Sequence, residues 1–170
     1  QLSVRVSVEQ PLLDADINIM GGLSLIDICK RYDVKKIIFA SSGGTVYGDQ
    51  KVFPAGESHP LAPISPYGVA KLATEQYLYY YYRSSGLDYI SLRYANIYGP
   101  RQDPHGEAGV VAIFSNKMLA GEVPVINGDG LQTRDYVYVE DVVKVNLAAV
   151  VSSFTGPVNI STGRETDVVT

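Results

Sequence analysis

The spacing of apolar residues along the chain switches between helical and strand patterns. Apolar residues recur at helical spacing over residues 14–32, where Ile17, Met20 and Ile26 belong to one broad stripe, and they predict an amphipathic helix. Residues 35–40 (KKIIFA) are a short, almost wholly apolar run, which is typical of a strand buried on both faces of a parallel sheet. The same patterns predict helices over residues 66–84, 109–120 and 140–151, strands over 89–94, 123–126 and 158–160, and an extended segment over 134–139.

Strands that alternate with long helices indicate an α/β fold built on a parallel sheet. The usual phosphate loop of a dinucleotide-binding sheet is missing, because no Gly-x-Gly-x-x-Gly lies between a strand and a helix. The glycines at 21–22, 43–44 and 128–130 do not fit that spacing. The chain also begins at Gln1 and stops within 167–170, which looks like the start of a helix. We therefore expect a piece of a longer protein that holds only the second half of a doubly wound sheet.

Composition and charge narrow the functional classes. The chain of 170 residues is 46% hydrophobic and 19% charged, with a net charge of −4 and both signs interspersed, so nothing indicates binding to nucleic acid or to an anionic membrane. No apolar run approaches the ~20 residues that a membrane span requires. The single cysteine, Cys29, is expected to pack as a small apolar residue, which favours a reducing cytoplasm. The histidines His59 and His105 have no neighbouring ligands, so no metal site is expected.

Residues 65–71 (SPYGVAK) place a phenol and an ammonium on one face at the start of a helix. Ser65 is a good N-cap and Pro66 suits the first helical position, so Tyr67 and Lys71 lie one turn apart. A free tyrosine has a pKa of ~10 and is a poor base at neutral pH. A close lysine, together with the positive charge of an oxidised nicotinamide, is a plausible means of stabilising the phenolate. The pair therefore predicts a general base that removes a hydroxyl proton during hydride transfer.

The spacing alone does not identify this pair, because the chain contains three Tyr-x-x-x-Lys matches: Tyr32/Lys36, Tyr47/Lys51 and Tyr67/Lys71. Their surroundings distinguish them. Tyr32 lies near the end of a predicted helix, and Tyr47 is followed by a Gly-Asp turn signal. Only Tyr67 follows a capped helix start and precedes uninterrupted helix formers, so we expect it to be the catalytic tyrosine.

Ligands of such sheets bind beyond the carboxyl ends of the strands. That rule selects the loop Ser41–Thr45 after one predicted strand and Asn96 after the next. A hydroxyl of Ser42 or Thr45 could bond the substrate hydroxyl and share its proton with Tyr67. The alternative is a Gly/Ser turn that only reverses the chain.

Arg134 follows the glycine turn at 128–130 and is suited to a bidentate contact with a phosphate. The alternative is an arginine on a solvated strand that pairs with the neighbouring Asp135. Spacing alone does not separate the two.

Four segments resemble the extended short-chain dehydrogenase/reductase enzymes, within them the NAD-dependent epimerase/dehydratase family, and most closely its UDP-glucose 4-epimerase type. They are residues 41–48 (SSGGTVYG), 65–71 (SPYGVAK), 92–102 (LRYANIYGPRQ) and 128–142 (GDGLQTRDYVYVEDV). The resemblance implies a Rossmann-like doubly wound parallel sheet without its amino-terminal half, and part of a small sugar-nucleotide-binding domain. It implies three regions: the second half of the NAD-binding domain at 1–98, part of the substrate domain at 99–139, and at 140–170 a return to the sheet and the start of a truncated carboxyl-terminal region.

The resemblance also implies roles for individual residues. Tyr67 would be the base, and Lys71 would bind the nicotinamide ribose and lower the pKa of Tyr67. Many epimerases have a serine where this chain has Gly43, so the partner hydroxyl would be Ser42 or Thr45, with Ser42 favoured. The remaining residues implied to contact NAD are Asn18, Ser41, Ser42, Tyr94 and Ala95, and those implied to contact the substrate phosphates are Asn96 and Arg134.

The implied activity is NAD-dependent C4 epimerisation of a UDP-hexose through a 4-keto intermediate. The alternatives are a dehydratase, reductase or decarboxylase of the same family, and a non-catalytic sugar-nucleotide-binding fragment. Positions 41–45 contain no carboxylate, whereas the 4,6-dehydratases place Thr-Asp-Glu in this loop. The resemblance further implies a homodimer formed through helices 14–32 and 66–84. The run of tyrosines at 79–82 agrees with an interface, although these side chains could simply cover the sheet.

Overall fold

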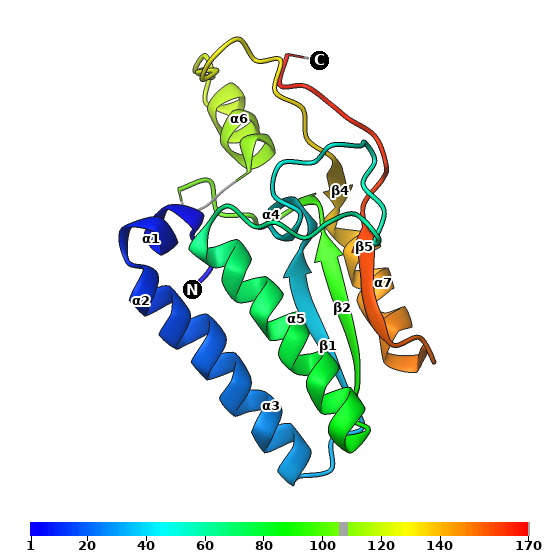
Figure 1. Cartoon of the computed structure of the whole chain (residues 1–170). Coiled ribbons are helices and arrows are strands. Elements are labelled where there is room, and N and C mark those ends of the chain that lie inside the picture. Colours follow the sequence, from blue (N-terminus) through cyan, green and yellow to red (C-terminus); the bar gives the residue numbers. More distant parts are fainter. Residues whose placement is uncertain (106–108, 170) are drawn as a thin grey trace.

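The computed structural model describes residues 1–105 and 109–169, and its centre is a sheet of three parallel strands. The strands lie in the order β1 (Lys36–Ser42), β2 (Asp88–Tyr94) and β5 (Gly156–Ile160), as Figure 1 shows. In the register of the sheet, Ile38 pairs with Ile90 and Leu92 pairs with Val158. The predicted strands at 35–40, 89–94 and 158–160 are therefore confirmed, with bounds that differ by one or two residues.

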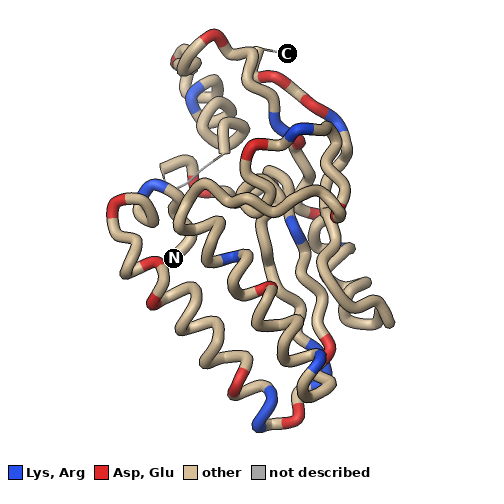
Figure 2. The backbone as a smooth tube through the Cα atoms, in the orientation of Figure 1, with Lys and Arg blue, Asp and Glu red and all other residues tan. Residues whose placement is uncertain are grey.

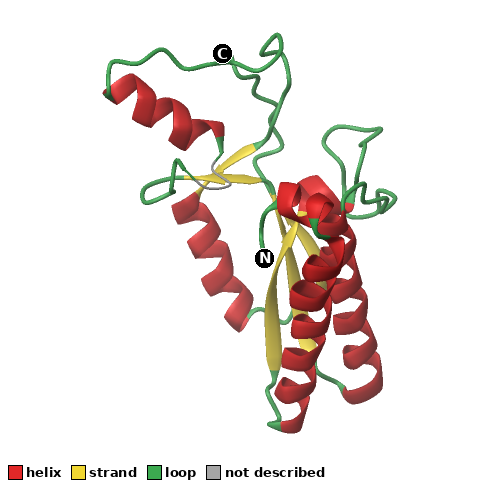
Figure 3. Cartoon of the chain, turned by 90° about the vertical axis from the view of Figure 1, so that its left-hand side faces the viewer, coloured by secondary structure: helices red, strands yellow, loops and turns green. Residues whose placement is uncertain are grey.

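Helices cover both faces of this sheet (Figures 1 and 3). On one face, α5 (Pro66–Ser85) and α3 (Gly21–Arg31) bury a cluster made of Ile26, Leu78, Leu87 and Tyr89. On the other face, α7 (Val139–Val151) buries a second cluster made of Ile90, Leu92, Ala149 and Ile160. Successive strand residues point to opposite faces, which is why the strands read as continuous apolar runs.

The first part of the chain forms helices throughout. It comprises α1 (Val4–Glu9), α2 (Pro11–Asp14), a π-helix η1 (Ala15–Met20) and then α3. The predicted helix at 14–32 is thus found, but its first turns are wound as a π-helix. Such segments are rare and are frequently located at functional sites.

Helix α5 begins and ends as its sequence predicts. The Ser65 hydroxyl accepts a hydrogen bond from the Gly68 N–H at 3.1 Å, and Pro66 occupies the first turn. Gly86 ends the helix with φ of 71°, a left-handed conformation that glycine adopts without strain. The prediction for 66–84 is confirmed to within one residue.

A smaller lobe lies beyond the carboxyl end of the sheet. It contains β3 (Asn96–Tyr98) paired in parallel with β4 (Tyr136–Tyr138), and the separate helix α6 (Val110–Leu119), seen at the top of Figure 1. Of the predicted extended segment at 134–139, β4 occupies the middle. The predicted helices at 109–120 and 140–151 correspond to α6 and α7.

Two predictions about this lobe are wrong. Residues 123–126 form no strand, because Val123 and Val125 lie exposed and have no partner strand in the described part of the chain. Residues 167–169 do not begin a helix, and Thr170 lies outside the described residues. The predicted turn at 128–130 is present, with Gly128 and Gly130 at φ of 81° and 79°.

The loop over residues 49–64 contacts β5, where Asn159 donates hydrogen bonds to Glu57 at 2.8 Å and to the Ala55 carbonyl at 2.9 Å. At Gly48, where φ is 65°, a Cβ atom would lie 1.9 Å from the carbonyl oxygen of Ala62, so only glycine fits. Figure 2 shows acidic and basic residues interspersed along the chain. None of the described helices is long and apolar enough to cross a membrane.

Candidate active site

The predicted catalytic residues lie at the carboxyl edge of the sheet, where the loop after β1 meets the start of α5. This loop contains the short helix α4 (Gly43–Val46), which packs on the first turn of α5. The contact is close, since a Cβ atom on Gly68 would lie 2.7 Å from the carbonyl oxygen of Thr45. The structure therefore brings the Ser42–Thr45 segment next to the helix turn that carries Tyr67, as the sequence predicted.

Tyr67 and Lys71 lie on one face of α5, as the spacing predicts. The Lys71 Nζ atom lies 5.4 Å from the centroid of the Tyr67 ring and 4.9 Å from that of Phe39. Its hydrogen bond is donated to the carbonyl oxygen of Ala40 at 2.8 Å. The ammonium group is thus held at the end of β1, beside the ring face of the tyrosine.

In the chain alone, the surroundings of this pair disfavour the charged form of each side chain. Burial raises the pKa of Tyr67, and the negative charge of Asp14 raises it further. Burial also lowers the pKa of Lys71, while Asp14 acts in the opposite direction. In the chain by itself, the pKa of Tyr67 is therefore raised, because loss of water and a nearby carboxylate both oppose the phenolate. The expected lowering by Lys71 together with a bound nicotinamide stays a prediction.

Asp14 is a residue of this region that the sequence analysis missed. Its side chain is buried, and its Oδ1 atom accepts a hydrogen bond from Asn18 Nδ2 at 2.8 Å. Its Oδ2 atom is buried without a hydrogen-bond partner among the described residues. The local sequence does not distinguish Asp14 from the nearby Asp16, because only the tertiary fold places Asp14 near Tyr67.

Asn18 lies on the π-helix and is connected to α5. Its amide donates to Asp14 and to the carbonyl oxygen of Gln1 at 3.0 Å, and its own carbonyl accepts from the Thr74 hydroxyl at 3.3 Å. Thr74 is three residues beyond Lys71 on α5. The predicted cofactor residue is therefore attached to the helix that carries the predicted base.

The hydroxyl groups after β1 differ in their partners. The Ser41 hydroxyl donates to Glu75 Oε1 at 2.5 Å inside the protein, and the Thr45 hydroxyl donates to the Ser42 carbonyl at 3.4 Å. The Ser42 hydroxyl has no hydrogen-bond partner within the described part of the chain. At Gly43, a Cβ atom would lie 3.3 Å from the Arg93 carbonyl oxygen, so a serine there would crowd the end of β2.

Tyr94 is the last residue of β2 and Ala95 follows it, and the Tyr94 side chain lies on the side of the sheet away from α5. The Tyr94 hydroxyl exchanges hydrogen bonds with Asn146 of α7 at 2.8 and 3.0 Å, and the Ala95 N–H donates to the Ile160 carbonyl at 2.9 Å. Burial raises the pKa of Tyr94, against the effect of the Asn146 contact. The structure thus places the Tyr94 phenol against α7 and not beside Tyr67.

The predicted phosphate residues lie exposed in the second lobe. The Asn96 N–H donates to the Asp135 carbonyl at 2.9 Å, and Arg134 donates from Nη1 to the Thr133 carbonyl at 2.7 Å. The Asp135 carboxylate accepts from Thr162 and Gly163, with the shortest contact at 2.7 Å. The alternative of an Arg134–Asp135 pair is therefore not what the structure contains, and the guanidinium has no acidic partner among the described residues.

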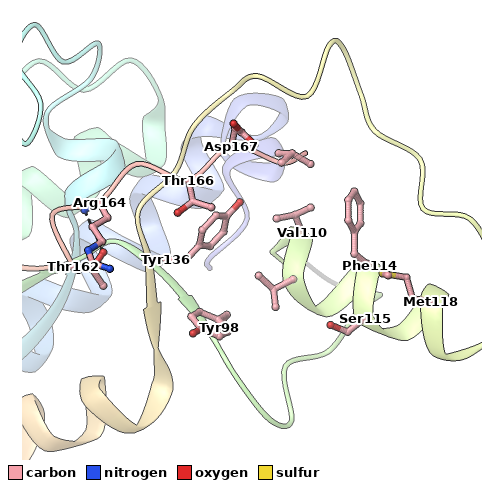
Figure 4. A pocket seen from close by; sticks show the side chains of 12 residues that line it. Tyr98, Val110, Phe114, Ser115, Met118, Tyr136, Thr162, Arg164, Thr166 and Asp167 are labelled. Atoms are coloured by element: carbon pink, nitrogen blue, oxygen red, sulfur yellow. Dashed lines mark hydrogen bonds between the residues drawn. The ribbon is translucent and has the colours of Figure 1, made fainter. Parts of the chain in front are cut away.

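A cavity of about 780 Å³ opens between α6 and the final segment of the chain. Figure 4 shows Val110 and Phe114 of α6 facing Tyr136 and Thr166 across it. Tyr98, Met118, Thr162 and Arg164 also line it. Aromatic and apolar walls with hydroxyl groups and a cation can hold a planar ring that bears polar groups. Sequence reasoning missed these residues, since they come from four separate segments: β3, α6, β4 and the final segment.

Known proteins similar to this chain include NAD-dependent epimerases. Residues 1–161 match the NAD dependent epimerase/dehydratase family. A putative UDP-glucose 4-epimerase of Methanocaldococcus jannaschii is 52% identical over 99% of this chain and 55% of its own length.

Two solved structures are similar over 99% of this chain. The UDP-glucose 4-epimerase of Thermotoga maritima with UDP-glucose has a TM-score of 0.96 at 55% identity, and 55% of it is covered. The UDP-glucose 4-epimerase of Thermus thermophilus in complex with NAD has a TM-score of 0.91 at 48% identity, and 56% of it is covered. The chain thus spans about half the length of the relatives that it matches.

Proposed function

The chain belongs to the NAD-dependent epimerase/dehydratase family, and we propose that it forms the catalytic part of a longer enzyme that interconverts UDP-glucose and UDP-galactose at C4. The observation that carries this proposal is the contact between the capped helix bearing Tyr67 and Lys71 and a loop whose Ser42 hydroxyl has no hydrogen-bond partner among the described residues. That loop contains no carboxylate, and elimination of water by a dehydratase would need an extra acid and base there. The site therefore favours reversible oxidation alone.

In this proposal, the chain's own residues move the proton. The Tyr67 phenolate accepts the proton of the substrate 4-hydroxyl, and Ser42 bonds the same oxygen and shares that proton. When bound, NAD would supply reversible hydride transfer at C4. The donors around the site fit its ribose and amide groups, since Lys71 supplies an ammonium and Asn18 an amide. Tyr67 then returns the proton, which restores both the enzyme and a hydroxyl.

For the nucleotide, we propose the cavity between α6 and the final segment. Its volume of about 780 Å³ lies within the range of small-molecule sites. Arg134, which has no acidic partner in the described residues, would contact the diphosphate together with Asn96. The Thermotoga relative, whose structure contains UDP-glucose, supports this assignment of substrate.

We further propose that the enzyme is a homodimer that associates through the η1–α3 region and α5. Leu25 and Ile28 of α3 are exposed, and so is Tyr80 of α5, with 59% of its surface accessible. Tyr81 is different, because it packs against the buried cluster that contains Ile26 and Leu78. The alternative that the tyrosines only pack against their own chain therefore holds for Tyr81. It does not hold for Tyr80, which stays exposed. The free Cys29 agrees with a cytoplasmic enzyme.

The test is an assay of the full-length enzyme, extended to the length of its relatives, for C4 epimerisation of UDP-glucose and of UDP-N-acetylglucosamine. Interconversion of the gluco and galacto forms with bound NAD would support the proposal. Release of a 4-keto-6-deoxy sugar would identify a dehydratase instead. Binding of UDP without any turnover would identify a non-catalytic sugar-nucleotide-binding protein.

A further inference from the structure

A network of buried polar side chains contacts Ser41 and Tyr47, the two residues that flank the Ser42–Val46 segment. Its centre is an ion pair between Glu75 of α5 and Arg93 of β2, with 2.6 Å between Arg93 Nη2 and Glu75 Oε2. Arg93 Nε also donates to both carboxylate oxygens, at 3.1 and 3.2 Å. Both side chains are almost fully buried, at 2% and 4% exposed. Burying two charges is costly, and apolar residues of the same size often serve stability equally well.

Hydrogen bonds connect this ion pair to the residues on both sides of the Ser42–Val46 segment, which is the catalytic loop of the proposed enzyme. On one side, Glu75 Oε1 accepts from the Ser41 hydroxyl at 2.5 Å. On the other side, Arg93 Nη1 donates to the Tyr47 hydroxyl at 3.0 Å, which donates in turn to Asn159 Oδ1 of β5 at 2.7 Å. Ser41 immediately precedes the Ser42–Val46 segment and Tyr47 immediately follows it. The loop is therefore bonded at both ends to one buried ion pair.

Glu75 lies on the same face of α5 as the proposed base, Tyr67. It is four residues beyond Lys71 and eight beyond Tyr67, so the three side chains project from neighbouring turns of α5. A rigid helix thus connects the anchor of the loop to the group that exchanges a proton with the substrate. Any shift of Ser41 relative to Glu75 would change the separation between Ser42 and Tyr67.

We propose that Glu75 is a positioning residue of the reaction: held by Arg93, its carboxylate fixes Ser41 and with it the loop that carries the proton-sharing hydroxyl. The inference rests on the proposed function. Tyr47, which sits in one of the three Tyr-x-x-x-Lys pairs, has its hydroxyl in the same network and fixes the other end of the loop. Misplacement of a reacting group by about 1 Å can cost about 100-fold in rate, so a small relaxation of the loop is enough to be measured.

The test compares variants in the full-length enzyme. Ser41→Ala removes the hydrogen bond from Ser41 to Glu75 without changing any charge. Tyr47→Phe removes the hydrogen bond between Arg93 and the Tyr47 hydroxyl. Glu75→Gln removes the negative charge from the ion pair with Arg93. We expect each to lower kcat by about 10- to 100-fold while the bound NAD and the KM for the UDP-sugar stay close to those of the parent. Because Ser41 acts through Glu75, the double variant should lose no more than Glu75→Gln alone.

Ser91→Ala is the matched control. Ser91 is a fully buried serine on the same strand as Arg93, and its hydroxyl has no hydrogen-bond partner among the described residues. It should keep the parent kcat, which would separate positioning from a general loss of packing. If Glu75→Gln does not fold, the decision rests on Ser41→Ala and Tyr47→Phe.

Two outcomes overturn the inference: a kcat within about twofold of the parent in both Ser41→Ala and Tyr47→Phe, or an equal loss in Ser91→Ala. A parent enzyme that turns over no UDP-hexose would instead refute the proposed function. An active parent that Tyr67→Phe inactivates, while Ser41→Ala and Tyr47→Phe stay active, keeps the proposed function and removes only Glu75 from it.

Discussion

Lys71 lies over the ring of Tyr67, yet its hydrogen bond is made to the carbonyl oxygen of Ala40 at the end of β1. The helix that carries both residues is therefore attached to the strand edge through the lysine. The same contact fixes the ammonium at a distance of 5.4 Å from the tyrosine ring centroid. Lys71 thus contributes both a positive charge and a structural contact, and only the charge can act on the phenolate.

Replacing Tyr67 by phenylalanine should lower kcat of the full-length enzyme by at least ~10²-fold, the usual scale for a positioned acid or base. Bound NAD should stay at the parent level, because the ring remains. Steady-state kinetics and the absorbance of the bound cofactor measure the two effects. Lys36→Ala and Lys51→Ala, from the other Tyr-x-x-x-Lys pairs, serve as controls with near-normal kcat. Near-normal turnover in Tyr67→Phe would remove Tyr67 from the mechanism.

Asp14→Asn should shift the acid limb of the kcat–pH profile to lower pH. The carboxylate of Asp14 raises the pKa of Tyr67, and the phenolate is the active form of a base. Removing this negative charge lowers that pKa, so activity is retained at lower pH. An asparagine can still accept the hydrogen bond from Asn18. Asp16→Asn, at an exposed position two residues away, should leave the profile in place, and an unshifted Asp14→Asn profile would show that Asp14 does not act on the base.

Gly68→Ala should both destabilise the protein and lower kcat. Its Cβ atom would lie 2.7 Å from the Thr45 carbonyl oxygen and 3.0 Å from Pro63 Cβ, so α4 must move away from α5. Overpacking of this kind costs about 1–3 kcal/mol in the free energy of unfolding. Urea unfolding and kinetics test both effects. Gly44→Ala is the control, because no atom lies within 4 Å of its Cβ position. Equal stability of the two variants would contradict the close contact.

Arg134→Ala should mainly weaken substrate binding. Loss of a charge-assisted contact to a phosphate is worth ~1.5–3 kcal/mol, which is roughly 10- to 150-fold in affinity. Free UDP should lose affinity by a similar factor, since the contact is to the nucleotide, and calorimetry measures it. Arg83→Ala, an exposed arginine in the last turn of α5, provides the comparison. Parent-like binding of UDP to Arg134→Ala would rule out the phosphate contact.

Tyr77→Glu combined with Tyr80→Glu should convert the proposed dimer of the full-length enzyme into a monomer. Both side chains are exposed on α5, at 38% and 59%, and a pair of charges in an apolar contact is unfavourable. Sedimentation velocity at micromolar concentration measures the change. Leu119→Glu, an 89% exposed position on α6, should leave the dimer intact. A parent that already sediments as a monomer would refute the interface.

The sequence was most informative where local chemistry determines structure. The start of α5 was predicted from Ser65 and Pro66, because capping depends on adjacent residues alone. The strand at 123–126 was predicted wrongly from its apolar residues. A strand needs a partner strand, and Val123 has none in the described chain.

The candidate site was only partly predictable for the same reason. Tyr67 and Lys71 are close in sequence, so their spacing together with the capped helix start at Ser65 identified them. Asp14, the Glu75–Arg93 pair and the cavity beside Phe114 combine residues from distant segments, and only the tertiary structure brings them together. The direction of the Tyr67 pKa shift followed from burial and from Asp14, neither of which a motif contains.

The parallel order β1–β2–β5 also has a consequence for the order of folding. β1, α5 and β2 follow one another within residues 36–94, whereas β5 comes in the chain only after β3, α6, β4 and α7. Closing a longer loop costs more entropy, so we expect the β1–α5–β2 unit to form before β5 docks. Tyr47 receives its Asn159 partner only at that last step. The Ser42–Val46 segment would then become rigid only at the end of folding, after β1 and β2 have already paired.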